Sequence, residues 1–308
     1  NKGTADSAIV DVPLQGRYVV PLAQHLGAPG EVLVAKGDEV KRGQPLSAPA
    51  GFVSVPVHAP TSGVVKSVKA WPHPLGRPMP AVEIEADGED LWHDSVTPRG
   101  DWRTMSPDEL RTCIRDAGIV GMGGATFPTH VKLSPPADKS IDTLILNGAE
   151  CEPYLTSDHR TMVEMASEVV EGIGLMMRVL DVATAWVGVE SNKPDAVDVM
   201  KAVTPSELDI RYALLETKYP QGSEKHLIQA LTGRAVPSGG LPMDVGCVVQ
   251  NVRTAAACYE AVALGRPMPA RTCTATREAL VAPRHVLARA GAAPLRAPPS
   301  CDDVTPAV

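Results

Sequence analysis

The amino-acid sequence predicts an α/β protein in which a mostly parallel sheet carries helices on both faces and follows an all-β domain. Two observations indicate this architecture. Short β-type runs rich in Val, Pro and Gly fill residues 10–88. From about residue 105 onward, apolar strands alternate with amphipathic helices. Repeated strand–helix units form parallel sheets that helices cover.

The N-terminal part, residues 1–90, has β-type runs separated by turns, at 18–20, 31–34, 63–68 and 81–84. Segments 41–46 and 57–63 resemble a barrel-sandwich hybrid domain of the biotinyl/lipoyl type. A carrier domain of that type needs a lysine on its exposed hairpin, which here lies near Phe52. No lysine occurs between Lys41 and Lys66. We therefore exclude a swinging arm and expect a docking platform.

Residues 89–104 are expected to connect this part to an α/β domain at 105–266 with a Rossmann-like sheet. Ser106-Pro107-Asp108-Glu109 is a capping box that begins the first helix, and Gly118 ends it. The pattern then predicts strands at 142–147, 184–190, 208–216 and 245–250. It predicts helices at 159–180, at 193–203 with Asn192 as N-cap, at 223–232 closed by Gly233, and at 254–264 closed by Gly265.

Composition excludes several functional classes. The 308 residues carry a formal net charge of −7, and no run of Lys and Arg exceeds two residues, so a nucleic-acid surface is not expected. No apolar run reaches the roughly 20 residues of a membrane helix. The six cysteines are at least 11 residues apart, so the chain has no C-x-x-C metal pair. Scattered, reduced thiols indicate a cytoplasmic enzyme.

A glycine-rich loop is the most informative motif. It runs from Gly121 to Lys132 and holds three glycines within four residues: Gly121, Gly123 and Gly124. Glycine lets a backbone approach a flat ring or a phosphate closely, and the amides of such a loop can form a nest for anionic oxygens. The motif is neither the G-x-G-x-x-G dinucleotide pattern nor a P-loop. The alternative interpretation is a tight turn without a ligand.

Three further polar motifs follow predicted strands. Asn147-Gly148-Ala149-Glu150-Cys151-Glu152 leaves the strand at 142–147, Gly222-Ser223-Glu224 opens the helix after 208–216, and Gln250-Asn251 ends the last strand. Open α/β sheets bind ligands beyond the carboxyl ends of their strands. These motifs are therefore candidate ligand contacts, with ordinary solvated turns as the alternative.

Together the four motifs resemble the C subunit of the Rnf ion-translocating oxidoreductase complex (RnfC, also called RsxC). They are more distantly similar to the flavin-bearing, NADH-oxidising subunit of respiratory complex I. The resemblance covers residues 10–270. It implies that the protein binds FMN non-covalently and that NADH is a substrate. No residue of this chain is then expected to be catalytic, because the hydride passes between cofactors.

The resemblance assigns the cofactor-binding residues. Phe127 would stack on the nicotinamide, Lys132 would contact FMN, and Glu152 would lie near NADH. The remaining matched positions are Gly121, Gly123, Gly124, Asn147, Glu150, Gly222, Glu224, Gln250 and Asn251. Three positions depart from the complex I pattern: Thr126 replaces a glycine, Ala149 an aspartate and Ser223 a glutamate. These departures weaken the expectation for NADH more than that for FMN.

The implied function is that of an electron-input subunit in a membrane-associated ion-translocating oxidoreductase. It would pass electrons between NADH and iron–sulfur carriers through FMN. The partners would be the other Rnf-type subunits and NAD(H), with the chain peripheral at the cytoplasmic face of the inner membrane. The alternatives are a flavin-dependent cobalamin reductase of related architecture and a non-catalytic scaffold.

Two features of the C-terminal part differ from the family. Full-length Rnf C subunits carry cysteine runs for 4Fe–4S clusters, and these runs are absent from this sequence, so no metal site is expected here. Either the chain is a fragment, or electrons leave through another subunit. Residues 267–308 would be a partial or degenerate β-grasp ligand-binding segment, with Arg277 in place of a turn glycine. The Ala/Pro-rich tail at 287–308 is expected to be mobile.

Overall fold

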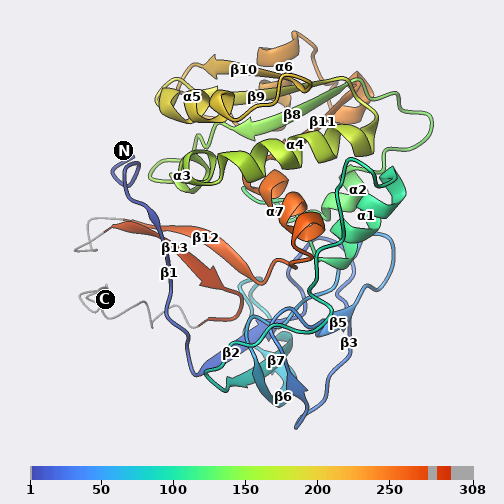
Figure 1. The fold of residues 1–308 in the computed structure, drawn as a ribbon, viewed down its shortest axis with the longest axis vertical. Helices are drawn as coiled ribbons and strands as arrows, with labels where there is room; N and C mark the ends of the chain where they lie inside the picture. Colours follow the sequence, from blue (N-terminus) through green and yellow to red (C-terminus); the bar gives the residue numbers. More distant parts are fainter. Residues whose placement is uncertain (1, 277–282, 293–308) are drawn as a thin grey trace.

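The computed structural model describes residues 2–276 and 283–292. Figure 1 shows a helix-covered sheet at the top, a smaller all-β part at the bottom and a three-stranded sheet beside them. The upper sheet has the order β10-β9-β8-β11, with every neighbouring pair parallel. Its strands are β8 (Thr143–Gly148), β9 (Thr184–Glu190), β10 (Asp209–Leu215) and β11 (Cys247–Asn251). The expected parallel α/β sheet is confirmed.

Helices cover both faces of this sheet because side chains alternate along each strand. Leu144 and Leu146 pack in the main core, together with residues of α4 (Ala166–Leu180), α5 (Pro194–Ala202) and α7 (Val252–Ala263). Ile145 faces the other way, toward α6 (Glu224–Thr232) and the 3-10 helix η1 (Pro242–Val245). A Cβ on Gly172 of α4 would lie 1.9 Å from the Ala255 carbonyl oxygen of α7. These two helices therefore cross in close contact.

Several expected helix boundaries are confirmed, and two are wrong. Ser106 and Glu109 form the reciprocal capping box of α1 (Pro107–Asp116). The helix expected at 159–180 is instead two helices, α3 (Ser157–Glu164) and α4, because Met165 leaves helical geometry with φ −127° and ψ 33°. No glycine or proline marks this break. The N-cap of α5 is Lys193, whereas Asn192 turns its side-chain oxygen toward the Lys193 Nζ atom, 3.0 Å away.

The N-terminal part forms a barrel-like arrangement. One sheet has the order β2-β7-β6-β4, and β3 pairs with β5. The strands are β2 (Arg17–Pro21), β3 (Glu31–Val32), β4 (Glu39–Val40), β5 (Ser47–Ala48), β6 (Gly63–Trp71) and β7 (Met79–Ala86). The hairpin that holds Phe52 contacts the short helix α2 (Thr129–Lys132), where His130 Nε2 lies 2.9 Å from the Phe52 carbonyl oxygen. This part is thereby joined to the segment that follows the glycine loop.

A third sheet, β1-β13-β12, joins the two ends of the chain. β1 (Ile9–Asp11) runs parallel to β13 (Arg284–Arg289), and β12 (Ala270–Ala275) runs antiparallel to β13. The expectation of a mobile tail from residue 287 is therefore wrong for 287–289, because pairing with β1 and β12 orders them. Arg277 and the tail at 293–308 lie outside the described residues. Within the described part, no helix is long and apolar enough to cross a membrane.

Candidate functional site

The four polar motifs meet around two adjoining cavities at the carboxyl ends of β8 and β11. The larger cavity has a volume of about 550 Å³, within the usual range of small-molecule sites. Ten of the twelve predicted site residues line it: Gly121, Gly123, Gly124, Phe127, Lys132, Asn147, Gly222, Glu224, Gln250 and Asn251. Leu241, Pro242, Met243, Val248 and Val249 give it an apolar wall.

The smaller cavity has a volume of about 290 Å³ and is more polar. The other two predicted site residues, Glu150 and Glu152, line it together with Asp158. The two cavities share the glycine loop, Asn147, Gly222 and Asn251 as lining. The structure therefore brings all twelve predicted positions together. Their roles toward a ligand stay predictions.

The glycine loop is closed at its base and pinned to a helix. The Gly121 amide donates to the Phe127 carbonyl (2.8 Å), and the Met122 amide donates to Thr254 Oγ1 of α7 (2.9 Å). Gly123 has φ +73°, a conformation that side chains disfavour. Among the described residues, no atom lies within 4 Å of the position that a Cβ on Gly124 would take. The loop is thus fixed, and at Gly124 it leaves open space in the cavity.

Asn147 of β8 and Lys132 of α2 both contact the segment at the start of α6. Asn147 Nδ2 donates to the Gly222 carbonyl (2.8 Å), while Asn147 Oδ1 accepts from the Ala149 amide (3.1 Å). Lys132 Nζ lies 2.6 Å from Glu224 Oε1. The lysine charge predicted for a ligand is therefore paired with a carboxylate that lines the same cavity.

Glu150 is 6% exposed, and its carboxylate binds the first turn of α3. Its oxygens accept from the amides of Asp158 (2.8 Å) and His159 (3.3 Å) and from Ser157 Oγ (3.1 Å). A carboxylate at a helix N-terminus satisfies otherwise unpaired amides. Glu150 itself has φ 49°, which is unusual for a residue with a Cβ. Its side chain therefore fixes α3 beside the smaller cavity.

Asn251 is the N-cap of α7 and also bonds Asp158. Its Oδ1 accepts from the amides of Arg253 (2.8 Å) and Thr254 (3.3 Å), and its Nδ2 donates to Asp158 Oδ2 (2.6 Å). Removal from water, reinforced by the negative charge of Glu150, raises the pKa of Asp158 to about 8. The raised pKa favours the protonated form of Asp158, which would reduce the negative charge of the smaller cavity.

Gln250 is the one predicted site residue with a buried polar atom left unsatisfied. Its side chain is 2% exposed, and its Nε2 atom has no hydrogen-bond partner within the described residues. A buried donor of this kind costs free energy unless it is paired. Because Gln250 lines the larger cavity, the donor suits a ligand with an acceptor group.

Sequence reasoning missed four residues of the site: Asp158, Thr254, Arg253 and Arg271. The N-cap pattern from Asn251 to Thr254 could have placed Thr254 in the first turn of α7 and hence near the loop. Asp158 lies in the first turn of a helix that the sequence places two residues too late. Arg271 belongs to β12 of another sheet and reaches the smaller cavity through tertiary packing alone.

The comparisons with known proteins agree with this architecture. The family described as the Nuo51 FMN-binding domain matches residues 114–260, and the RnfC barrel sandwich hybrid domain matches residues 1–89. The NAD+-reducing [NiFe]-hydrogenase in its H2-reduced state has a similar fold, with a TM-score of 0.54 and 22% identity over 64% of this chain and 40% of that chain. Fold and comparisons together define an α/β protein whose parallel sheet is similar to the Nuo51 FMN-binding domain and follows an N-terminal barrel-like sheet.

Three curated relatives identify the family to which the chain belongs, and each of them is the C subunit of its complex. That of the proton-translocating ferredoxin:NAD(+) oxidoreductase complex of Clostridium ljungdahlii is 48% identical over 94% of this chain and 63% of its own length. The Na(+)-translocating counterpart of Acetobacterium woodii is 47% identical over 89% of this chain and 62% of its own length. The C subunit of the ion-translocating oxidoreductase complex of Cronobacter sakazakii is 44% identical over 91% of this chain and 36% of its own length. The chain belongs to the family of Rnf complex C subunits, and it spans less than two thirds of the length of these relatives.

Proposed function

We propose that this chain binds FMN in the larger cavity and NADH beside it, as the electron-input part of an ion-translocating ferredoxin:NAD+ oxidoreductase. The observation that carries the proposal is the convergence of all twelve motif residues on two adjoining cavities. They come from the glycine loop, the ends of β8 and β11 and the start of α6. A scaffold that had lost its ligand would not need to keep these polar groups together.

The residues fit a flavin in four respects. The cavity is of suitable volume, its wall around Leu241 and Val249 is apolar enough for a ring system, and Gly124 leaves room for close backbone approach. The unpaired Gln250 Nε2 offers a donor to a ring carbonyl or ribityl hydroxyl. When bound, FMN would supply the exchange between two-electron hydride transfer and one-electron transfer.

The protein's own residues would bind and orient. The amides of 121–125 and Lys132 would hold anionic oxygens, and the Phe127 ring would present a flat apolar face for the nicotinamide. Glu152 would contact NADH from the smaller cavity. The Asp158 proton would keep that cavity from repelling an anionic nucleotide. No side chain is assigned a catalytic proton transfer, because orientation of the two rings is the main requirement.

We propose three parts of the chain: a barrel-sandwich hybrid at 1–90, a Rossmann-like FMN and NADH domain at 105–266, and a partial β-grasp segment at 267–308. The strand β1 pairs with β13, so residues 9–11 contribute to the last part. Within its complex, the chain would lie peripherally at the cytoplasmic face of the inner membrane. There it would contact other Rnf-type subunits and iron–sulfur carriers whose cysteine motifs are absent from this sequence.

Equilibrium dialysis and visible spectroscopy of the purified chain with FMN test the proposal. We expect micromolar retention of a non-covalent flavin, bleaching on addition of NADH, and no stoichiometric iron or sulfide. Absence of FMN retention would contradict the proposed site. Retention of FMN without reduction by NADH would restrict the site to a flavin carrier, and oxidation of the NADH-reduced flavin by added cobalamin would favour the cobalamin reductase alternative.

A further inference from the structure

We propose that the N-terminal segment at residues 2–9 positions the loop at 150–155, and that Lys2 is the positioning residue. The loop carries Glu150 and Glu152, both of which line the smaller cavity. The segment is far from the loop in sequence and reaches it through the fold. In Figure 1 the chain near the N-terminus lies beside α3, the helix that follows the loop. The part of the inference that concerns FMN rests on the proposed function; the part that concerns the loop does not.

The Lys2 ammonium group is held by three backbone carbonyls of this loop. Its Nζ atom lies 2.6 Å from the carbonyl oxygen of Glu150, 2.9 Å from that of Glu152 and 2.6 Å from that of Leu155. An ammonium group has three donors, so all three are used on this one loop. Hydrogen bonds from a charged donor are stronger than neutral ones.

The loop needs such a counter-charge because of its backbone geometry. Glu150 has φ 49° and Tyr154 has φ 70°, so two residues with a Cβ adopt the left-handed region within five positions. The loop curls, and its carbonyl oxygens converge, which is unfavourable without a donor between them. The buried Lys193 Nζ donates to the carbonyl oxygen of Ala149, the residue just before the loop (2.7 Å), and pairs with Glu190 Oε2 (3.1 Å). Two ammonium groups therefore hold the loop.

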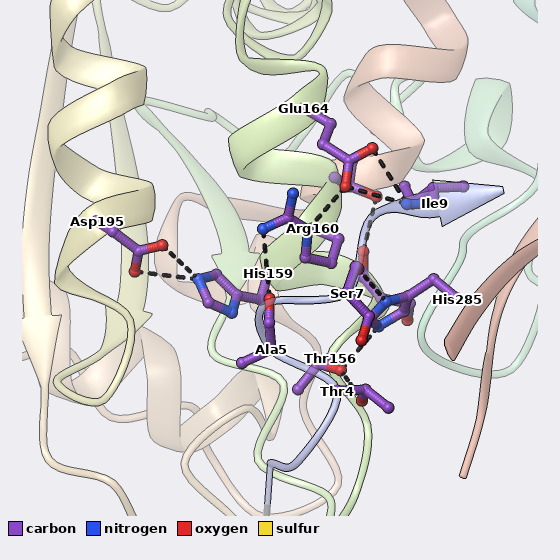
Figure 2. Close-up of polar contacts among 12 residues, drawn as sticks. Thr4, Ala5, Ser7, Ile9, Thr156, His159, Arg160, Glu164, Asp195 and His285 are labelled. Atoms are coloured by element: carbon purple, nitrogen blue, oxygen red, sulfur yellow. Dashed lines mark hydrogen bonds and ion pairs between the residues drawn. The ribbon is translucent and has the colours of Figure 1, made fainter. Parts of the chain in front are cut away.

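A buried relay fixes the segment that carries Lys2. Figure 2 shows Thr4, Thr156 and His285 in a line, with His285 also bonded to Ser7. The Ser7 carbonyl can only accept, so His285 Nδ1 donates to it (2.8 Å). A neutral imidazole then accepts at Nε2, and Thr156 Oγ1 donates there (2.7 Å). Burial lowers the pKa of His285, which agrees with the neutral ring.

Helix α3 holds the same segment from a second side. Arg160 donates to the Ala5 carbonyl (3.3 Å), and Glu164 accepts from the Ile9 amide (3.1 Å), as Figure 2 shows. These contacts place Lys2 beside the loop. Lys2 then acts on the cavity through Glu150, whose carboxylate fixes the α3 amides of Asp158 and His159. Loss of the ammonium group should therefore make the loop at 150–155 and the first turn of α3, which border the smaller cavity, more mobile.

Hydrogen–deuterium exchange of the full chain without FMN tests the positioning directly. The variants are Lys2→Met, which keeps length and removes charge, and Lys2→Arg, which keeps charge with a planar donor set. Lys201→Met, at an exposed lysine in the last turn of α5, is the control. We expect the amides of Asp158 and His159 to exchange at least about tenfold faster in Lys2→Met. Lys2→Arg should fall between Lys2→Met and the unmodified chain, and Lys201→Met should be unchanged.

FMN titration and NADH-driven flavin reduction give the second readout. Lys2→Met should raise the KM for NADH more than it lowers kcat, and Lys2→Arg should restore part of the KM. Unchanged exchange at Asp158 and His159 in Lys2→Met would overturn the inference, whatever the flavin data show. If the unmodified chain binds no FMN, the proposed function fails, while the exchange experiment still decides the role of Lys2.

Discussion

Lys132 and Glu224 form an ion pair that joins α2 to the first residue of α6, with Nζ 2.6 Å from Oε1. Their side chains are 26% and 44% exposed, so the pair contributes little to stability. Its importance is its place: both residues line the larger cavity. The carboxylate holds the lysine in position and also competes with any anionic ligand for its charge.

Substitution of either partner should separate these two effects. Lys132→Ala should weaken FMN binding at least about tenfold, because a charge-assisted hydrogen bond is lost. Glu224→Gln should bind FMN no more weakly than the unmodified chain, since the lysine is freed, but its reduction by NADH should slow. FMN titrations with Lys225→Ala as control measure the affinity, and NADH-driven reduction of the FMN-loaded proteins measures the rate. Equal FMN affinity in Lys132→Ala and the control would show that the ion pair is structural only.

Phe127→Ala should slow reduction of the bound flavin by NADH and leave FMN affinity nearly unchanged. The substitution removes aromatic area from the cavity wall and no phosphate contact. Stopped-flow reduction of FMN-loaded protein measures the rate, and dialysis measures retention. Loss of FMN with normal reduction of the remaining loaded protein would contradict the assignment of Phe127 to the nicotinamide side, and Thr126 would then be the next residue to test.

The glycine loop allows a test that separates ligand approach from loop folding. A methyl group on Gly124 meets no protein atom within 4 Å among the described residues, so Gly124→Ala should keep the melting temperature. It should weaken FMN binding about tenfold if the flavin approaches the backbone there, the scale of an overpacked contact.

Gly123→Val is the matched disruptive variant. Gly123 has φ +73°, and a Cβ there would lie 3.0 Å from Asn251 Nδ2. We expect loss of FMN binding and a lower melting temperature from thermal scans by circular dichroism, with the sheet still folded. Unchanged FMN affinity in both glycine variants would leave the loop as a turn without a ligand.

Asp158 should make stability depend on pH. Burial and the charge of Glu150 raise its pKa from 3.8 to about 8 in the folded chain. The folded state therefore holds the proton more tightly than the unfolded state, so this group's contribution to stability is greatest below pH 3.8 and falls as pH rises toward 8.

Asp158→Asn removes this titration while its side-chain oxygen can still accept from Asn251 Nδ2. The variant should gain melting temperature over the unmodified chain, and the gain should grow between about pH 5 and about pH 8. Asp198→Asn, on α5, is the control. A gain that does not change with pH would mean that Asp158 is ionised in the folded protein throughout this range.

The sequence predicted the main sheet because its strands are rich in apolar residues, and it predicted the first helix because a capping box begins it. The capping box at Ser106 and Glu109 and the closing glycine Gly233 are formed as expected. The break at Met165 was missed because both helices around it share one apolar periodicity. Asn192 was misplaced because a nearby ammonium group, Lys193, attracts its side-chain oxygen.

Local chemistry in the sequence determined which residues gather at the site. Glycines within four positions and polar residues after apolar strands are short-range patterns, and parallel strands necessarily bring their carboxyl ends together. Tertiary structure alone decided how those residues are used. The pairing of Lys132 with Glu224, the capping roles of Glu150 and Asn251, and the hold of Lys2 on the loop at 150–155 all join distant segments. Hydrogen bonds and burial of this kind depend on distances that no local pattern contains.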